Sequence, residues 1–446
     1  MTGAAPRLAF VVVALLFAAR CEFHGVAPLS HDPTEGSPPL SVIAAPLPRP
    51  PVTVAPEEAE ALGNTAPLVP LYAALEALEQ RRAAAPVVMM QLGDSHTAAD
   101  FFSGRLRERF QERFGAAGRG MLPPGIPYPY YHPALVRVAE TPGWQRASSF
   151  AVPGPFGMGG VVQQTAQAGA GMTLTETEPA GFDRAFFEVL RQPQAGTLRL
   201  QVDEDTAHDF ATAAPLVAPH WVEFDTPRRS HTMTLTARGD GSVTLLSWGT
   251  QRETPGVVYE NLGISGATIA VTGHWDPGIV AGELGRREPA VIVVAYGTNE
   301  AAEPAAQLGD YARLFRNRVA ALRAAAPQAA ILVVGPPDMN KRGQAPVAGC
   351  DARDAGWAPP PGVALVRDAQ REVAAREGWY FWDWQQAMGG ACAIDRWERQ
   401  TPPLAYPDHV HLQAAGYRRS ADALFGEIMD GYRRYRARPG APRIGS

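Results

Sequence analysis

The stretch VVMMQLGDSHTAADFF (residues 87–102) leads from a short apolar segment directly into a serine that stands between an acid and a histidine. Gly, Asp and Ser are ordinary turn and capping residues, so Gly93, Asp94 and Ser95 are consistent with a plain turn between a strand and a helix. The same arrangement would hold the Ser95 hydroxyl at the end of a sheet as a nucleophile. Ser95 alone does not decide between these two interpretations, so the rest of the chain has to supply its partners.

On either side of this stretch, apolar strands alternate with amphipathic helices, as in a doubly wound α/β domain. The runs AVIVVAYG (290–297) and AILVVGPP (330–337) are uniformly apolar and rich in β-branched residues. Parallel strands that helices cover on both faces have this composition. A further, aromatic strand is expected at 379–384. Apolar residues at helical spacing predict helices at about 71–78, 102–114, 311–322, 363–377 and 414–435.

The middle of the chain, from about 120 to 255, has a different character. Helical periodicity gives way to short β-type runs: AFFEVL, GTLRLQV, WVEFDT, HTMTLTA and SVTLLSW. Turn residues such as ARGDGS separate these runs. The pattern predicts an antiparallel sandwich or jelly roll, inserted into the α/β domain.

Composition and charge narrow the function. The chain has 446 residues, of which 46% are hydrophobic and 19% charged, and its formal net charge is −5. Because the charge is not strongly basic, we expect no nucleic-acid partner. The sequence contains no CxxC or HExxH pattern, so we expect neither a metal site nor another cofactor.

The N-terminus has the features of an export signal. Arg7 precedes an apolar run at 8–19, which is short for a membrane span but fits the hydrophobic region of a signal peptide. A retained anchor is the alternative, and Arg20 argues against lipidation of Cys21. Residues 26–56 are rich in Pro and Ala, as in a semi-rigid tether. We therefore expect an exported protein of the periplasm or cell envelope, with membrane association through the N-terminus as the open alternative.

The cysteine count fits an exported chain. If Cys21 lies in or near a removed segment, Cys350 and Cys392 remain. Two cysteines in an exported protein favour one disulfide. Two separate buried thiols are the alternative.

Polar clusters follow the predicted strands, at the edge where open α/β sheets bind ligands. Ser95 can supply the nucleophile that acyl transfer needs, His411 the base, and Asp408, three residues before His411, the group that orients the imidazole. The Asn299 side-chain amide and the backbone N–H groups of Gly266 and Ser95 can stabilise an oxyanion. These residues therefore predict a serine esterase site.

These residues occur in four blocks whose order resembles the SGNH, or GDSL-like, hydrolase superfamily. The blocks are GDSH with Ser95, GISGAT with Gly266, GTNE with Asn299, and DHVH with Asp408 and His411. The resemblance implies a flavodoxin-like, three-layer α/β domain. The sequence departs from the family pattern at His96, where the family name implies Leu, and at Glu300, where many members carry Asp.

Longer segments are similar to the peptidoglycan O-acetylesterases of the Ape type, namely QLGDSHTAADFFSGRLRERFQERFGAAGRGM, VVYENLGISGATI and WDWQQAMGG. In that family a jelly roll like a carbohydrate-binding module lies between the Ser block and the Gly block. The resemblance implies that the substrate is O-acetylated peptidoglycan or another acylated glycan. In peptidoglycan, the acetyl group would be removed from O6 of N-acetylmuramic acid. The resemblance leaves the oligomeric state open. The predicted division is a signal peptide or anchor at 1–25, a linker at 26–56, the hydrolase domain at 57–120 and 256–438, the β insert at 121–255 and a tail at 439–446.

Alternatives remain open for individual residues and for the function. His409 is a second candidate base, Asp408 can be a surface cap, and Asn299 can be a turn former. His96 is either structural or in contact with substrate. Four tryptophans are candidate sugar platforms, although core positions are more common for such residues: Trp221, Trp248, Trp382 and Trp384. An O-acetyltransferase with the same triad, or a non-catalytic carbohydrate-binding protein, are the alternative functions.

Overall fold

The computed structural model describes residues 60–438, apart from 206, 346, 348–349 and 351–355. The predicted export segment, the tether at 26–56 and the tail at 439–446 lie outside these residues. In the part of the chain that the structure describes, no helix is both long enough and apolar enough to cross a bilayer.

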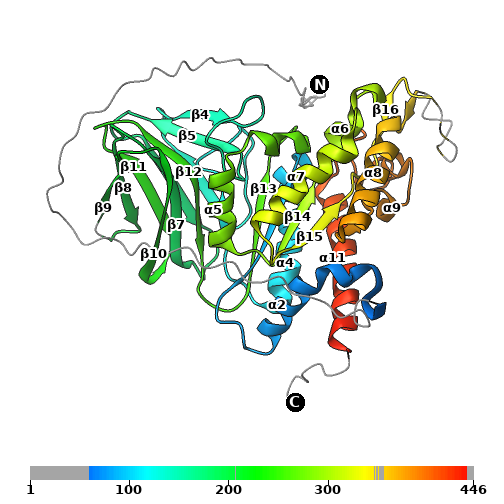
Figure 1. Ribbon diagram of the computed structural model, residues 1–446, viewed down its shortest axis with the longest axis horizontal. Helices are drawn as coiled ribbons and strands as arrows, with labels where there is room; N and C mark the ends of the chain where they lie inside the picture. The colour runs from blue at the N-terminus through cyan, green and yellow to red at the C-terminus, as the bar shows by residue number, and fades with distance from the viewer. Residues whose placement is uncertain (1–59, 206, 346, 348–349, 351–355, 439–446) are drawn as a thin grey trace, which may run out of the picture. The chain divides into compact units, whose positions relative to one another are not determined.

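A parallel five-stranded sheet lies at the centre of the α/β fold, as the apolar runs predict (Figure 1). Neighbouring strands follow the order β13-β1-β14-β15-β18. If the five strands are numbered as they follow one another in the chain, their order across the sheet is 2-1-3-4-5, which is the flavodoxin-like arrangement. The direction in which strands are added reverses at β1. The carboxyl ends of β1 and β14 are therefore neighbours at the switch point, where such folds bind ligands. The strands are β1 (Val87–Gly93), β13 (Val257–Gly263), β14 (Val291–Ala295), β15 (Ala330–Val334) and β18 (Tyr380–Trp382).

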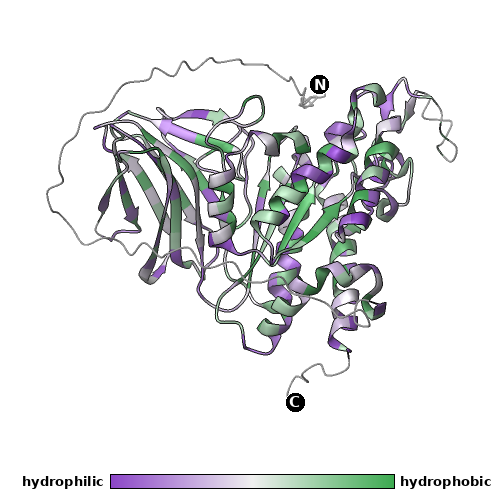
Figure 2. Ribbon diagram, in the orientation of Figure 1, coloured by the Kyte–Doolittle hydropathy of each residue, from purple (hydrophilic) through white to green (hydrophobic). Residues whose placement is uncertain are grey.

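Helices cover both faces of this sheet, because successive side chains of a strand point to opposite faces. Met89 and Val293 pack in one apolar cluster with α2, α4 and α11, and Val294 and Val333 pack in another with α5, α7 and α8. Figure 2 shows hydrophobic strands between helices whose sides are mixed. The helices are α2 (Val69–Glu79), α4 (Phe102–Phe114), α5 (Pro277–Arg287), α7 (Tyr311–Ala325), α8 (Pro361–Glu377) and α11 (Ala414–Arg436).

The structure differs from the sequence prediction at three elements of the α/β fold. Strand β13 is an edge strand that the sequence pattern did not reveal, because Glu260 and Asn261 interrupt its apolar run. The helix predicted at 102–114 is confirmed as α4, but a separate single turn that the sequence did not predict, α3 (Ser95–Ala98), precedes it. Asp100 separates the two with a left-handed φ of 52°. The aromatic strand is shorter than expected, because Asp383 caps a new helix, α9 (Trp384–Met388).

Two antiparallel sheets occupy the described part of residues 120–251, where the β-type runs predict strands. One sheet has the order β10-β7-β12-β5-β4, with β2 also paired to β12, and the other has the order β3-β6-β11-β8-β9. The predicted turn ARGDGS joins β11 to β12 and so connects the two sheets. The strands are β2 (Gly120–Leu122), β3 (Val136–Glu140), β4 (Gln145–Ser148), β5 (Val161–Thr165), β6 (Gly171–Glu176), β7 (Phe182–Arg191), β8 (Thr197–Val202), β9 (His208–Ala211), β10 (Ala218–Ser230), β11 (Thr232–Ala237) and β12 (Val243–Gln251).

Side chains from both antiparallel sheets share one apolar core. Trp248 is fully buried in it, and its indole N–H donates to the carbonyl of Pro123 at 3.0 Å. Trp221 is also buried, but in the cluster that includes Ile279 of α5, and its ring stacks on Phe186. Both tryptophans are therefore core residues, and neither is an exposed sugar platform.

Shorter elements complete the described chain: η1 (Gly63–Leu68), η2 (Ile269–His274), α6 (Thr298–Ala302), η3 (Ala305–Gln307), β16 (Lys341–Arg342), β17 (Trp357–Ala358) and α10 (Ala393–Glu398).

Candidate active site

Ser95 is the first residue of the short helix α3, directly beyond the end of β1. Asp94 caps this turn, because its Oδ1 accepts the backbone N–H of His96 at 2.9 Å. Gly93 is required here by close packing, since a Cβ at this position would lie 2.2 Å from Thr97 Oγ1 and 2.7 Å from the Ala295 carbonyl oxygen. The sharp turn leaves Ser95 partly exposed between buried neighbours.

The structure brings Ser95, His411 and Asp408 together, although more than 300 residues separate the serine from the other two. Ser95 Oγ lies 3.0 Å from His411 Nε2, and Asp408 Oδ2 lies 2.7 Å from His411 Nδ1. Asp408 Oδ1 also accepts the backbone N–H groups of Val410 and His411, at 3.0 and 2.9 Å. Asp408 thus caps its own turn and contacts the imidazole at the same time.

The charges around His411 and Asp408 favour protonation of the His411 imidazole. Burial lowers the pKa of His411, but the hydrogen bond and negative charge of Asp408, together with the charge of Asp94, raise it above its ordinary value of 6.5. Burial raises the pKa of Asp408, but the hydrogen bonds from His411 and from the Val410 N–H outweigh it, and the pKa is about 2. Asp408 is therefore ionised when His411 takes up a proton.

Gly266 and Asn299 follow β13 and β14, the two neighbours of β1 in the sheet. Gly266 has a φ of 78°, a left-handed conformation that favours glycine. The Asn299 side-chain amide donates to the carbonyl of Ala267 at 2.9 Å. This hydrogen bond holds the Gly266 loop beside α6 and brings the two candidate oxyanion residues next to each other.

Glu300 has a role that the sequence analysis did not assign. It is buried, and its Oε1 accepts the backbone N–H of Ile269 at 2.8 Å, so it anchors the end of the Gly266 loop. Burial raises the pKa of Glu300 to about 7, although hydrogen bonds from backbone N–H groups oppose the rise. No sequence pattern points to this anchor, because it links positions 31 residues apart.

His96 is a structural residue in this fold. Its side chain is 2% exposed, and its Nδ1 lies 2.8 Å from the Tyr417 hydroxyl. Burial and the nearby His411 hold its pKa well below the ordinary value, so it is neutral. Trp384 packs against the His96 ring, and Trp384 and Trp382 are both buried. These two tryptophans are core residues rather than a sugar platform.

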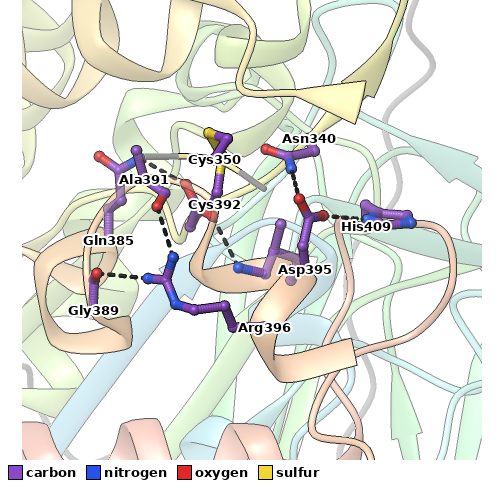
Figure 3. The surroundings of a disulfide bond; sticks show 11 residues. Asn340, Cys350, Gln385, Gly389, Ala391, Cys392, Asp395, Arg396 and His409 are labelled. Atoms are coloured by element: carbon purple, nitrogen blue, oxygen red, sulfur yellow. Dashed lines mark hydrogen bonds and ion pairs between the residues drawn. A yellow bond between two sulfur atoms is a disulfide. The ribbon is translucent and has the colours of Figure 1, made fainter. Parts of the chain in front are cut away.

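His409, the alternative base, makes a different contact. Its Nδ1 lies 2.5 Å from Asp395 Oδ1 on α10, whereas it is His411 that contacts Ser95. Asp395 follows shortly after Cys392, which forms a disulfide with Cys350 across a separation of 42 residues (Figure 3). The structure therefore confirms the predicted pairing of the two cysteines.

A search of the described residues finds no group of three or more His, Cys, Asp or Glu side chains arranged to hold a metal ion.

Comparison with known proteins identifies the class of this fold and site. The model of the GDSL-like lipase/acylhydrolase family matches residues 230–419. This range contains Gly266, Asn299, Asp408 and His411, whereas Ser95 precedes it because the antiparallel sheets separate the serine from the other blocks. None of the curated proteins matches the chain.

Solved structures include a peptidoglycan O-acetylesterase with a TM-score of 0.68 and 26% identity, covering 82% of this chain and 96% of that chain. A family two carbohydrate esterase from Clostridium thermocellum in complex with cellohexaose has 14% identity and a TM-score of 0.27, over 65% of this chain and 100% of that chain. An acetyl xylan esterase has 15% identity and a TM-score of 0.28, over 37% and 79% of the two chains.

The family model and the structural match identify the chain as an esterase similar to the GDSL-like acylhydrolases of the SGNH superfamily. Within this class, it resembles the peptidoglycan O-acetylesterases of the Ape type over most of its length.

Proposed function

We propose that the protein removes O-acetyl groups from peptidoglycan, at O6 of N-acetylmuramic acid, with Ser95, His411 and Asp408 as its catalytic triad. One observation carries the proposal: Ser95 Oγ lies 3.0 Å from His411 Nε2 at the switch point of the sheet. The likeness to a peptidoglycan O-acetylesterase, over 82% of the chain, supports the choice of substrate.

In the first half of the reaction, His411 Nε2 takes the hydroxyl proton while Ser95 Oγ attacks the acetyl carbonyl carbon. The imidazolium that forms is stabilised by Asp408, whose low pKa keeps it ionised. The tetrahedral intermediate then collapses, the bond to the sugar oxygen breaks, and His411 returns the proton to that oxygen. Ser95 now carries the acetyl group as an ester.

In the second half, His411 takes a proton from a water molecule, which attacks the acetyl-Ser95 carbonyl. The ester bond breaks, His411 returns the proton to Ser95 Oγ, and acetate leaves. The backbone N–H groups of Ser95 and Gly266 and the amide of Asn299 stabilise the oxyanion in both halves. Asn299 uses one N–H for Ala267, and its amide has a second that can serve the oxyanion.

We further propose that residues 121–255 are a domain like a carbohydrate-binding module, inserted into a hydrolase domain at 57–120 and 256–438. Their antiparallel sheets and common core support this proposal. An exported protein of the periplasm or cell envelope is proposed from the sequence of residues 1–56, because the cell-wall substrate is accessible there.

The test measures acetate released from O-acetylated peptidoglycan by the full-length protein and by its Ser95→Ala variant. Acetate release that requires Ser95 is the expected result. Cleavage of p-nitrophenyl acetate without acetate release from peptidoglycan would retain the triad and refute the substrate, and would point to another acylated glycan or to acetyl transfer between sugars. Near-normal hydrolysis by Ser95→Ala would refute the triad itself.

A further inference from the structure

Phe150, from the segment between β4 and β5, is an exposed aromatic side chain beside the candidate oxyanion loop. Phe150 is 56% exposed, although phenylalanine is among the residue types that are most often fully buried. An ideal Cβ built on Gly266 would lie 3.5 Å from the ring, at van der Waals distance. The ring therefore covers the Gly266 backbone from the side of the antiparallel sheets.

The backbone next to Phe150 is held firmly, although its ring is exposed. Ser149 is fully buried, and its N–H donates to the carbonyl of Gly160 at 2.8 Å. The Ser149 carbonyl lies 2.6 Å from His274 Nδ1, and the Ser149 hydroxyl accepts the indole N–H of Trp275 at 3.2 Å. These contacts fasten the segment to the chain that follows the Gly266 loop, so an exposed ring is presented from a fixed position.

We propose that Phe150 is a substrate-binding residue that stacks on a pyranose ring of the glycan, next to the sugar whose acetyl group is removed. The inference rests on the function proposed above, because Gly266 marks the position of the reacting carbonyl. The C–H face of a pyranose is apolar, and a flat aromatic ring buries such a face well. The antiparallel sheets then contribute directly to substrate recognition at the active site.

The test compares Phe150→Ala, Phe150→Leu and Phe150→Trp on a polymer and on a small ester. On acetylated polymer, Phe150→Ala and Phe150→Leu should lower kcat/KM about tenfold, mainly through KM, whereas Phe150→Trp should stay close to wild type. On p-nitrophenyl acetate, which has no sugar, all three should stay within about twofold of wild type, since the aromatic face then has no partner. Leu216→Ala, an exposed apolar side chain between β9 and β10, is the matched control and should change neither activity.

Equal losses on both substrates would overturn the inference, because Phe150 would then support the Gly266 loop rather than bind sugar. Unchanged polymer kinetics would also overturn it. Both O-acetylated peptidoglycan and acetylated xylan are assayed. Activity on xylan alone would refute the proposed function and leave the Phe150 inference to be judged on xylan. Activity on neither polymer, with p-nitrophenyl acetate still cleaved, would overturn both.

A second inference concerns His409, which lies between Asp408 and His411 and has a left-handed φ of 56°. Its side chain is 12% exposed, and that of Asp395, which it contacts at 2.5 Å, is 1% exposed. Asn340 joins both residues: its side-chain amide donates to Asp395 Oδ2 at 2.6 Å, and its backbone N–H donates to the His409 carbonyl at 2.9 Å (Figure 3). Trp357 stacks on the His409 ring with the ring centroids 4.0 Å apart.

We infer that Asp395 and Asn340 are positioning residues, which fix the His409 backbone and so keep the His411 imidazole directed at Ser95. Outside glycine, a left-handed residue is uncommon and needs its surroundings to hold it. The disulfide adds to this support, because Cys392 is the N-cap of α10, the helix that carries Asp395. The chain between Asn340 and Trp357 contains the other cysteine, Cys350.

The test compares His409→Ala with His409→Asn, because asparagine tolerates the left-handed conformation and its amide can donate to Asp395. His409→Ala and Asp395→Asn should lower kcat about tenfold on every ester while KM changes little, since the loss falls on the chemical step. Labelling of Ser95 by a fluorophosphonate should slow in proportion. His409→Asn should recover most of both rates.

The acid limb of the pH–rate profile should stay in place in these variants, because Asp408 still contacts His411. Arg396→Ala is the matched control: Arg396 also lies on α10 and donates to the carbonyls of Gly389 and Ala391, but not to His409. Normal kcat in folded His409→Ala, or an equal loss in Arg396→Ala, would overturn the inference. So would a loss in His409→Asn as large as that in His409→Ala.

Discussion

Replacing Asp408 by asparagine removes one charge from the proposed triad and keeps the size of the side chain. Asp408 Oδ1 accepts the backbone N–H groups of Val410 and His411, and an asparagine carbonyl oxygen can accept both. The NH₂ group that takes the place of Oδ2 cannot accept the hydrogen bond of the His411 Nδ1–H, which Oδ2 accepts at 2.7 Å in the wild type. The substitution therefore keeps the turn and removes the partner of the imidazole.

The size of the effect follows from the exposure of the pair. Two unit charges about 4 Å apart attract by about 1 kcal/mol in water and about 4 kcal/mol near a protein surface. The side chains of His411 and Asp408 are 39% and 47% exposed, so solvent screening favours the lower part of that range. A loss of about 1–3 kcal/mol lowers kcat/KM by about 5- to 150-fold. The same substitution in the serine-protease template costs about 10⁴-fold, because the asparagine holds the imidazole in the wrong tautomer.

The assay is kcat/KM for p-nitrophenyl acetate as a function of pH. A base works only when it is unprotonated, so wild-type activity should fall as the pH drops through the pKa of His411. Burial lowers that pKa, but Asp408 and then Asp94 raise it above 6.5. Removing the Asp408 charge should therefore move the acid limb of the profile to lower pH.

Asp408→Ala serves as the comparison, because it also removes the two turn hydrogen bonds and should lose more activity than Asp408→Asn. A loss of about 10⁴-fold in Asp408→Asn would refute the screening argument, since a loss of that size is the one that a wrong tautomer of the imidazole causes. An acid limb that stays in place would refute the assignment of that limb to His411.

Three further predictions concern the surroundings of the triad. Asn299→Ala should lower kcat by about 10²- to 10³-fold and leave KM nearly unchanged in steady-state kinetics, as loss of an oxyanion donor does; an effect confined to KM would contradict it. Replacing Cys350 and Cys392 by serine should reduce the free energy of unfolding in urea by up to about 4 kcal/mol, because the disulfide closes a loop across 42 residues; an unchanged urea midpoint would argue against that contribution. Burial raises the pKa of Glu300 from 4.5 to about 7, so between these values the folded protein keeps a proton that the unfolded chain has released, and stability falls as the pH rises from about 4.5 to about 7. Glu300→Gln should flatten the fall in thermal stability between about pH 4.5 and about pH 7, and an unchanged pH dependence would contradict this.

The sequence predicts those parts of the fold in which the local pattern and the tertiary environment agree. Strands β14 and β15 are apolar along their whole length because helices cover both faces, and this is visible in the sequence. Strand β13 is equally buried but contains Glu260 and Asn261, whose partners are far away in the chain. The Glu260 carboxylate accepts a hydrogen bond from the guanidinium of Arg287, and the Asn261 side-chain amide donates one to the Asp100 carboxylate. A pattern of residue types cannot show that a polar side chain will be paired inside the core.

The same distinction applies to the candidate site. Ser95, Gly266, Asn299, Asp408 and His411 stand at strand ends in recognisable blocks, so their proximity can be expected from the sequence. The residues that hold them cannot be expected in this way, because they act through contacts between parts of the chain that are far apart in the sequence. Their side chains are ordinary for their positions in the sequence, and only the structure reveals their contacts: Glu300, Asn340, Asp395 and His409.

The break between α3 and α4 shows how the nucleophile is supported. Asp100 adopts its left-handed conformation at the break, where its carboxylate accepts hydrogen bonds from Arg107 of α4 and Asn261 of β13. Burial raises the pKa of Asp100, but the charges of Arg107 and Arg119 outweigh it and lower the pKa, so the carboxylate is ionised.

Two hydrogen bonds extend this support into the segment that precedes β3. The backbone N–H of Ala134 donates to Asp100 Oδ2 at 2.9 Å, and the Tyr128 hydroxyl donates to the carbonyl of Ala98, the last residue of α3, at 3.1 Å. An uninterrupted helix after Ser95 would not direct these groups to the same point. The short turn that carries Ser95 is therefore fixed jointly by the α/β fold and by the segment that leads into the antiparallel sheets, which makes that segment part of the support of the nucleophile.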